Sequence, residues 1–156
     1  EGYLWDEGDP KKAFDKAIDN ANKVTMSLSD KFCVDRHKLH FLSLVKNQID
    51  ITFANEGEIM SLIEAKNFNE VISFAKEIKK ILVITRGEKG AISINNNEVT
   101  EISAKKNLNI LDLTGAGDLF AAGYLHGLVN NLSQKECLKK GTELSSKIIQ
   151  QIGARL

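Results

Sequence analysis

Apolar residues recur along this chain with two periods, and the two periods predict helices and strands in alternation. After Pro10, apolar positions three, four, seven and eight apart share one face, which is typical of an amphipathic helix. Residues 81–85 form an unbroken run of Leu and β-branched side chains, which is typical of a strand covered on both faces. Helices are expected at 10–23, 34–46, 56–65 and 68–80, from 114–118 to about 128, and at 133–152. Strands are expected at 2–5, 24–28, 49–54, 81–85, 90–94, 98–103 and 108–111.

This order of elements predicts a three-layer α/β/α fold. Strands that alternate with helices favour a mainly parallel, Rossmann-like sheet with helices on both faces. Asn95, Asn96 and Asn97 separate two adjacent strands and predict one inserted hairpin. A polar turn is expected at 6–10, with Pro10 at the first position of the helix that follows. The chain of 156 residues shows no internal repeat or long linker, so residues 1–156 are expected to belong to a single domain.

Composition excludes several classes of protein. Lys and Arg total 21, equal to Asp and Glu, and this balance argues against a dedicated nucleic-acid binder. No apolar run approaches the roughly 20 residues that span a bilayer. Cys33 and Cys137 form neither a CxxC pair nor a disulfide framework, and no secretory signal is recognisable, so we expect reduced thiols in a cytoplasmic protein.

The histidines do not predict a metal site from the sequence. His37 and His40 stand three apart on an expected helix, a spacing that suits a metal ion, but no further ligand follows them at ligand spacing. His126 falls inside a later helix and is interpreted as packing or solvated.

The strongest chemical signal is the segment 112–120, which reads Asp-Leu-Thr-Gly-Ala-Gly-Asp-Leu-Phe between an expected strand and a helix. Gly115 and Gly117 allow a tight turn, so that the amides of Gly115, Ala116 and Gly117 point outward at the positive end of a helix dipole. Such a site favours phosphate oxygens, and Asp118 beside it suits removal of a proton from an attacking hydroxyl. The alternative is a simple sharp turn in which Asp118 complements the helix dipole.

The segment 112–120, followed by Ala121-Ala122-Gly123-Tyr124, resembles the signature of the ribokinase-like (PfkB) carbohydrate kinase family. Other segments agree with the family in order and spacing, and the resemblance covers essentially the whole chain. They are the N-x-x-E segment 55–58, the T-x-G-x-x-G segment 85–90 and the glycine–alanine turn at 153–154. Leu113 departs from the pattern, since it stands where the family usually has Thr.

The resemblance implies a role for each matching residue. Asp118 is the general base, and Gly115, Ala116 and Gly117 form the anion hole for the γ-phosphoryl group of ATP. Asn55 and Glu58 organise Mg²⁺ and its waters around the phosphates, with Glu58 acting through water. The nucleotide lies against Thr85, Arg86, Gly87 and Gly90, and Asp112 and Gly153 resemble a K⁺ site.

Each of these segments also has a purely structural interpretation. Asn55 and Glu58 fit a helix N-cap with a capping box, and Thr85–Gly87 fits an ordinary strand end. Gly123 and Gly127 are interpreted as sites of close helix packing. The lysine pairs 79–80, 105–106 and 139–140 are interpreted as solvated surface.

The resemblance also indicates what part of the fold the chain supplies. Family members are about twice this length, so the chain is expected to be the C-terminal nucleotide-binding and catalytic half, without the N-terminal half and its lid. The segments 1–6, 27–30 and 35–37 look most like the adenosine kinase-type branch.

Three functions are compatible with these residues to different degrees. The first is an ATP-dependent kinase that phosphorylates a small-molecule alcohol: an adenosine-like nucleoside, or else fructose, ribose or 2-keto-3-deoxygluconate. The second is a non-catalytic nucleotide-binding module. The third, a dinucleotide-binding oxidoreductase, is disfavoured because the third glycine of its motif would fall at Phe120. The sequence leaves a monomer and a homodimer open.

Overall fold

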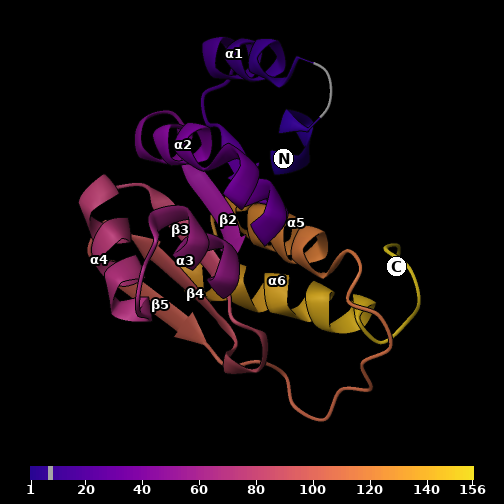
Figure 1. Ribbon diagram of the computed structural model, residues 1–156. Helices are drawn as coiled ribbons and strands as arrows, with labels where there is room; N and C mark the ends of the chain where they lie inside the picture. The colour runs from indigo at the N-terminus through magenta and orange to yellow at the C-terminus, as the bar shows by residue number, and fades with distance from the viewer. Residues whose placement is uncertain (7–8) are drawn as a thin grey trace. The chain divides into compact units, whose positions relative to one another are not determined.

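The computed structural model describes residues 1–6 and 9–156 (Figure 1). These residues divide into two compact units. The first unit comprises residues 1–84 and 94–98, and the second comprises residues 85–93 and 99–156. The turn expected at 6–10 includes residues 7 and 8, which lie outside the described residues.

Helices and strands alternate as the sequence predicts, which confirms the α/β architecture. The helices are α1 (Pro10–Asn20), α2 (Lys31–Asn47), α3 (Glu56–Ile63), α4 (Phe68–Ile78), α5 (Ala116–Val129) and α6 (Gln134–Ile148), with two 3₁₀ turns, η1 (Gly2–Trp5) and η2 (Gly87–Lys89). The strands are β1 (Thr25–Ser27), β2 (Ile51–Asn55), β3 (Ile81–Thr85), β4 (Ala91–Asn95) and β5 (Glu98–Ile102). They form one sheet in the order β1-β2-β3-β4-β5, and β1 runs parallel to β2 with Thr25 opposite Ile51.

Two expected strands are wrong. Residues 2–5 form η1, in which Gly2 lies against Leu28 so closely that a Cβ would come within 2.7 Å of the Leu28 carbonyl oxygen. The Trp5 ring packs edge-on against Phe14 and Phe41, so this apolar segment is anchored by its rings and not by strand pairing. Residues 108–111 have no regular secondary structure and are unpaired with any described strand, and the Ile110 and Leu111 side chains are more than half exposed.

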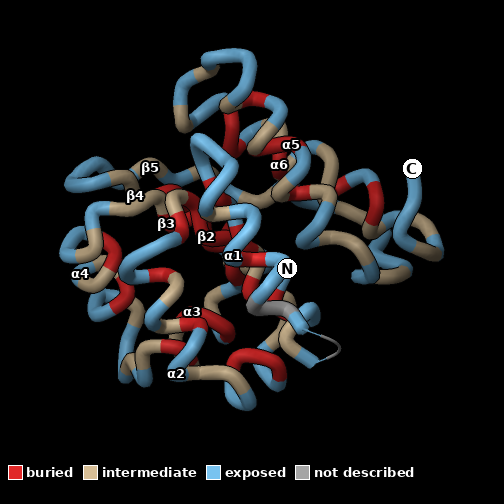
Figure 2. Tube along the Cα trace, turned by 90° about the horizontal axis from the view of Figure 1, so that it is seen from above, coloured by how far each residue is buried: buried red, intermediate tan, exposed pale blue. Residues whose placement is uncertain are grey.

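The core of the first unit lies on its strands. Four successive residues of β2 are buried, and the tube in Figure 2 is red along this segment. Parallel strands with both faces covered give such unbroken apolar runs, as the sequence predicts for β3. The largest fully buried side chains of this unit are Phe41, Met26, Leu28, Ile49, Ile51, Ile59, Leu62, Leu82, Ile84 and Ile94.

In the second unit, glycines bring α5 and α6 side by side (Figure 1). A Cβ on Gly123 would lie 2.6 Å from the carbonyl oxygen of Lys140, and one on Gly127 would lie 2.9 Å from Cys137 Sγ. On the facing helix, a Cβ on Gly141 would lie 2.7 Å from the Phe120 carbonyl oxygen. This confirms the packing role predicted for Gly123 and Gly127.

None of the described helices combines the length and the apolar character that crossing a membrane requires.

Substitution Gly123→Ala is expected to destabilise the protein by about 1–3 kcal/mol, because the added methyl group forces the helix backbones apart. Urea unfolding would measure the change. Gly117→Ala is the matched control, since a Cβ there meets nothing within 4 Å and Ala is the better helix former. Equal midpoints for the wild type and Gly123→Ala would contradict this account of the helix contact.

Candidate active site

The turn that begins α5 presents backbone amides at a helix N-terminus. Gly115 is the N-cap residue with φ +76°, a left-handed conformation that favours glycine, and no side chain caps this helix end. The Ala116 amide donates to the Leu113 carbonyl oxygen at 3.1 Å. Within the described part of the chain, the Gly115 and Gly117 amides have no such partner. Of the three amides predicted for the anion hole, these two are therefore free to receive a ligand.

Asp118 lies in the first turn of α5, next to these amides, and is exposed. No hydrogen bond or ion pair from another described residue engages its carboxylate. A carboxylate held by its helix but otherwise unoccupied can accept a proton from a bound hydroxyl.

Asp112 ties the turn to the segment that follows α6. Its Oδ1 accepts hydrogen bonds from the amide and hydroxyl of Thr114 at 2.9 and 2.7 Å, and its Oδ2 accepts one from the Gly153 amide at 2.9 Å. Hydrogen bonds hold the pKa of the Asp112 carboxyl below its usual range. The bond from the Gly153 amide has the largest effect, and the bonds from Thr114 come second. Asp112 and Gly153, paired in the sequence prediction as a cation site, are thus in direct contact.

The same two segments meet a second time at Gly115. A Cβ on Gly115 would lie 2.9 Å from the Ala154 Cβ, so the glycine–alanine turn packs directly against the N-cap of α5. The Leu111 amide also donates to the Ile149 carbonyl oxygen at 2.8 Å. The sequence did not single out Thr114 as a binding partner of Asp112, although its position two residues after an aspartate is typical of an Asx turn.

Residues 85–90 form a tight loop at the end of β3. The Arg86 amide donates to the Gly90 carbonyl oxygen at 2.8 Å, and the Gly90 amide donates to Gly87 at 3.0 Å. Gly90 has φ +97°, and a Cβ there would collide with the Ile102 carbonyl oxygen, so Gly90 is required by the chain itself. Gly87 has φ +55° and open space around it, so its surface is available to a ligand.

Asn55 and Glu58 belong to the first unit and form the capping box of α3. Asn55 Oδ1 accepts from the Glu58 amide at 2.9 Å, while Glu58 accepts from the Asn55 amide at 2.8 Å and from Asn55 Nδ2 at 2.6 Å. The structural interpretation of this motif is therefore confirmed. The capping role does not explain why this carboxyl group is buried. Glu58 is only 5% exposed, and burial raises the pKa of its carboxyl group.

Glu58 fits a magnesium ion or its waters. Among the described residues no cation pairs with this carboxylate, whose recorded partners are both donors of Asn55. Each oxygen keeps a lone pair, and hard oxygen ligands suit Mg²⁺. A nearby divalent charge would offset the cost of desolvating the ionised group.

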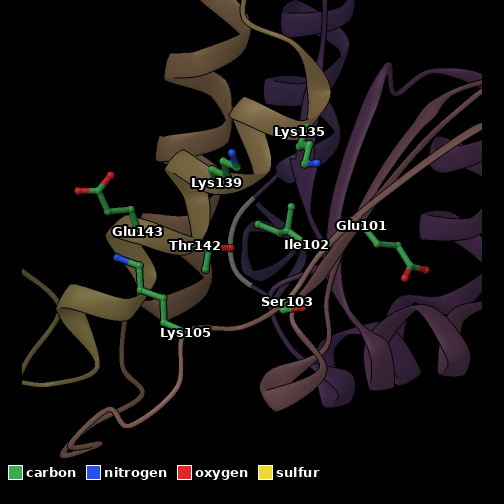
Figure 3. A pocket seen from close by; sticks show the side chains of 8 residues that line it. All are labelled: Glu101, Ile102, Ser103, Lys105, Lys135, Lys139, Thr142 and Glu143. Carbon is green, nitrogen blue, oxygen red and sulfur yellow. The ribbon is translucent and has the colours of Figure 1, made fainter.

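The second unit also contains a pocket of about 580 Å³ that the sequence did not indicate (Figure 3). Its walls are the end of β5 with the residues that follow, and the face of α6 that carries Lys135, Lys139, Thr142 and Glu143. Thr142 and Ile102 face one another across it in Figure 3. Lys105 and Lys139, interpreted from the sequence as solvated surface, line this pocket.

Substitution Asp112→Asn should loosen the turn, because an amide cannot accept at both positions where Asp112 now meets N–H donors. Hydrogen exchange at the Thr114 and Gly153 amides is expected to accelerate, whereas Asp118→Asn, which removes no internal hydrogen bond, should leave both amides protected. Unchanged exchange in Asp112→Asn would show that the turn holds without this carboxylate.

Comparisons with known proteins agree with the geometry. The family model for the pfkB family carbohydrate kinase matches residues 4–156. The structure is similar to adenosine kinase from Sinorhizobium meliloti, with a TM-score of 0.95 and 36% identity, and to a probable sugar kinase from Rhizobium etli CFN 42, with a TM-score of 0.94 and 37% identity. Each match covers 99% of this chain, but 49% and 48% of those two chains.

A cytidine kinase from Thermococcus kodakarensis is 30% identical over 112 residues, which are 70% of this chain and 40% of that protein. The chain thus spans half or less of the length of these relatives. With a family model that matches almost every residue, the chain belongs to the pfkB carbohydrate kinase family.

Proposed function

We propose that the protein transfers the γ-phosphoryl group of ATP to an alcohol of a small molecule, with an adenosine-like nucleoside as the first acceptor. The observation that carries this proposal is the unoccupied Asp118 carboxylate beside the open Gly115 and Gly117 amides at the start of α5. Donors for a phosphate and an acceptor for a proton, presented by one helix turn, are what phosphoryl transfer to a hydroxyl needs.

In this mechanism the acceptor oxygen attacks the γ-phosphorus in line with the bond to the departing ADP. Asp118 takes the hydroxyl proton, the P–O bond to the β-phosphate breaks, and the Gly115 and Gly117 amides stabilise charge on the transferred group. Magnesium, when bound, neutralises phosphate charge and orients the γ-phosphoryl group. Asn55 and Glu58 are the residues proposed to hold it or its waters.

The nucleotide is proposed to extend from the pocket on α6 to the turn at Gly115. Thr142 lines the pocket, and Ile149, seven residues later, contacts Leu111 beside the turn. At 1.5 Å per residue this is a span of about 10 Å along α6, over which the nucleotide is proposed to lie. The pocket volume falls within the usual range for a small ligand. Its walls carry three lysines, Lys105, Lys135 and Lys139, and two glutamates, Glu101 and Glu143, so the assignment rests on the position of the pocket and not on its charge.

The loop at Thr85, Arg86, Gly87 and Gly90 is proposed to line the ribose and phosphate side of the nucleotide. Asp112 and Gly153 are proposed to border a K⁺ site, because Asp112 Oδ2 accepts a single hydrogen bond and keeps one lone pair. The pair would then position the turn both directly and through the cation.

A sugar acceptor is the second candidate. The solved relative from Rhizobium etli, described as a probable sugar kinase, is as similar to this chain as the adenosine kinase is. Fructose, ribose and 2-keto-3-deoxygluconate therefore stay in the set of acceptors to be tested.

The deciding experiment measures ADP release from Mg-ATP by the full gene product over a panel of nucleosides and small sugars. We expect one acceptor to stimulate release. Asp118→Asn should lower kcat with that acceptor by at least about a hundredfold while ATP affinity stays nearly unchanged.

A parallel loss of activity and ATP affinity would contradict the role of Asp118 as a base and favour a structural role. ATP binding without release for any acceptor would favour a non-catalytic nucleotide-binding module of the same fold.

The magnesium assignment has its own test. Substitution Glu58→Gln is expected to raise the Mg²⁺ concentration for half-maximal activity about tenfold, because it removes the charge at nearly the same side-chain size. It also removes one of the two hydrogen bonds that Glu58 accepts from Asn55, a loss that the control reproduces because both Glu70 oxygens accept N–H donors too. Glu70→Gln is the matched control, since Glu70 caps α4 with Asn67 through the same N-x-x-E spacing but is exposed. Equal Mg²⁺ requirements in both variants would reduce the 55–58 motif to a helix cap.

A further inference from the structure

Three sequence segments that the proposed function leaves unused come together in the first unit. The Tyr3 hydroxyl donates to Asp30 at 2.5 Å, and the Tyr3 amide donates to Ser29 Oγ at 3.3 Å. Arg36 donates to both oxygens of Asp6, at 3.1 and 2.5 Å. These contacts join the segments 1–6, 27–30 and 35–37, which suggests that they serve one local site.

At the centre of this region lie Asp6, Cys33 and His37, here called the Asp6 cluster. One ligand atom from each of the three side chains lies within 4.8 Å of those of the other two. His37 Nε2 is 2.8 Å from Asp6 Oδ1. Cys33 and His37 are four residues apart on α2, which is kinked at His37 (φ −116°, ψ 20°), and their ligand atoms come together at this kink.

The three side chains of the Asp6 cluster differ in how far they are buried. Cys33 is fully buried, whereas the side chains of His37 and Asp6 are 22% and 29% exposed. A metal ion at this point would have two ligands at the surface and one beneath it, with water able to reach the open side. Three protein ligands and one water are a common tetrahedral arrangement for zinc.

We propose that the Asp6 cluster binds a divalent d-block metal ion such as Zn²⁺ through Cys33 Sγ, His37 Nε2 and Asp6 Oδ1. The ligand types support this choice, because thiolate and imidazole select such ions over Mg²⁺ or Ca²⁺. The proposal does not rest on the proposed kinase activity, since none of its residues takes part in that mechanism.

Coordination changes two existing interactions. Cys33 binds as the thiolate and its proton passes to the solvent, while the metal replaces the contact between His37 Nε2 and Asp6 Oδ1. The thiolate and the carboxylate balance both charges of the ion. Arg36 can therefore keep its 2.5 Å contact with Asp6 Oδ2 and orient that ligand without facing an uncompensated dication.

The bound ion would fasten η1 to α2. Trp5, which precedes Asp6, already packs against Phe14 and Phe41 with ring centroids 4.5 and 5.4 Å away. A cross-link from residue 6 to residues 33 and 37 would exist only in the folded chain, so the metal should raise thermal stability by mass action.

The test is titration of the full protein with Co²⁺, whose thiolate charge-transfer absorption reports a bond to sulfur. We expect one equivalent of Co²⁺ to give this band, and the band to disappear in Cys33→Ser but persist in Cys137→Ser, which removes the other buried thiol. Zn²⁺ should displace Co²⁺ and raise the Tm of the wild type.

Partly exposed ligands keep the test decisive if Cys33→Ser does not fold. His37→Gln and Asp6→Asn should each weaken Co²⁺ binding by about tenfold or more, whereas His40→Gln, on the same helix, should not. Absence of the band in the wild type, or equal Co²⁺ affinity in His37→Gln and His40→Gln, would overturn the proposal and leave the cluster as a set of charge contacts.

Discussion

The close contact between α5 and α6 is the constraint on which the second unit depends. Gly123, Gly127 and Gly141 let the helix backbones approach, and no larger residue fits without moving them. The contact sets the start of α5 beside the end of α6, where Asp112 binds Gly153 and Gly115 packs on Ala154. Three glycines outside the turn therefore help to fix the geometry of the turn that carries Asp118.

In the first unit, the structural and functional interpretations of one motif use the same atoms. In the capping box of α3, each Glu58 oxygen accepts one hydrogen bond from Asn55, and these two bonds hold the carboxylate in a single orientation. Asn67 and Glu70 form a similar cap in the open, where solvent screens the charge. What separates the two motifs is burial, since Glu58 has been taken out of water without a cationic partner among the described residues. Its raised pKa is the electrostatic cost of that position, which a bound cation would offset.

Local patterns were enough to predict most of the fold. Periodicity located the six helices and five strands of the described residues, because it records which face of each element is buried. It failed at residues 2–5 and 108–111, where an apolar run lacks the neighbouring strand that pairing requires. The Gly-Ala-Gly turn was predictable because its chemistry is local, but the α6 pocket was not, since Lys105 and Lys139 are 34 positions apart and look like ordinary surface. The Asp6 cluster was missed for the same reason, because Asp6 and His37 lie 31 residues apart.

The balance of charge around the turn argues for catalysis over simple binding. A site that only held phosphate would gain from amides and lysines and would lose affinity through any adjacent carboxylate. Asp118 is such a carboxylate, in the first turn of a helix whose open amides attract anions, and no described cation neutralises it. Its repulsion of a bound phosphate is useful when a hydroxyl must give up a proton as it attacks, because the proton then neutralises the carboxylate. The proposed transfer therefore gives Asp118 a chemical role in addition to the favourable interaction of its carboxylate with the dipole of α5.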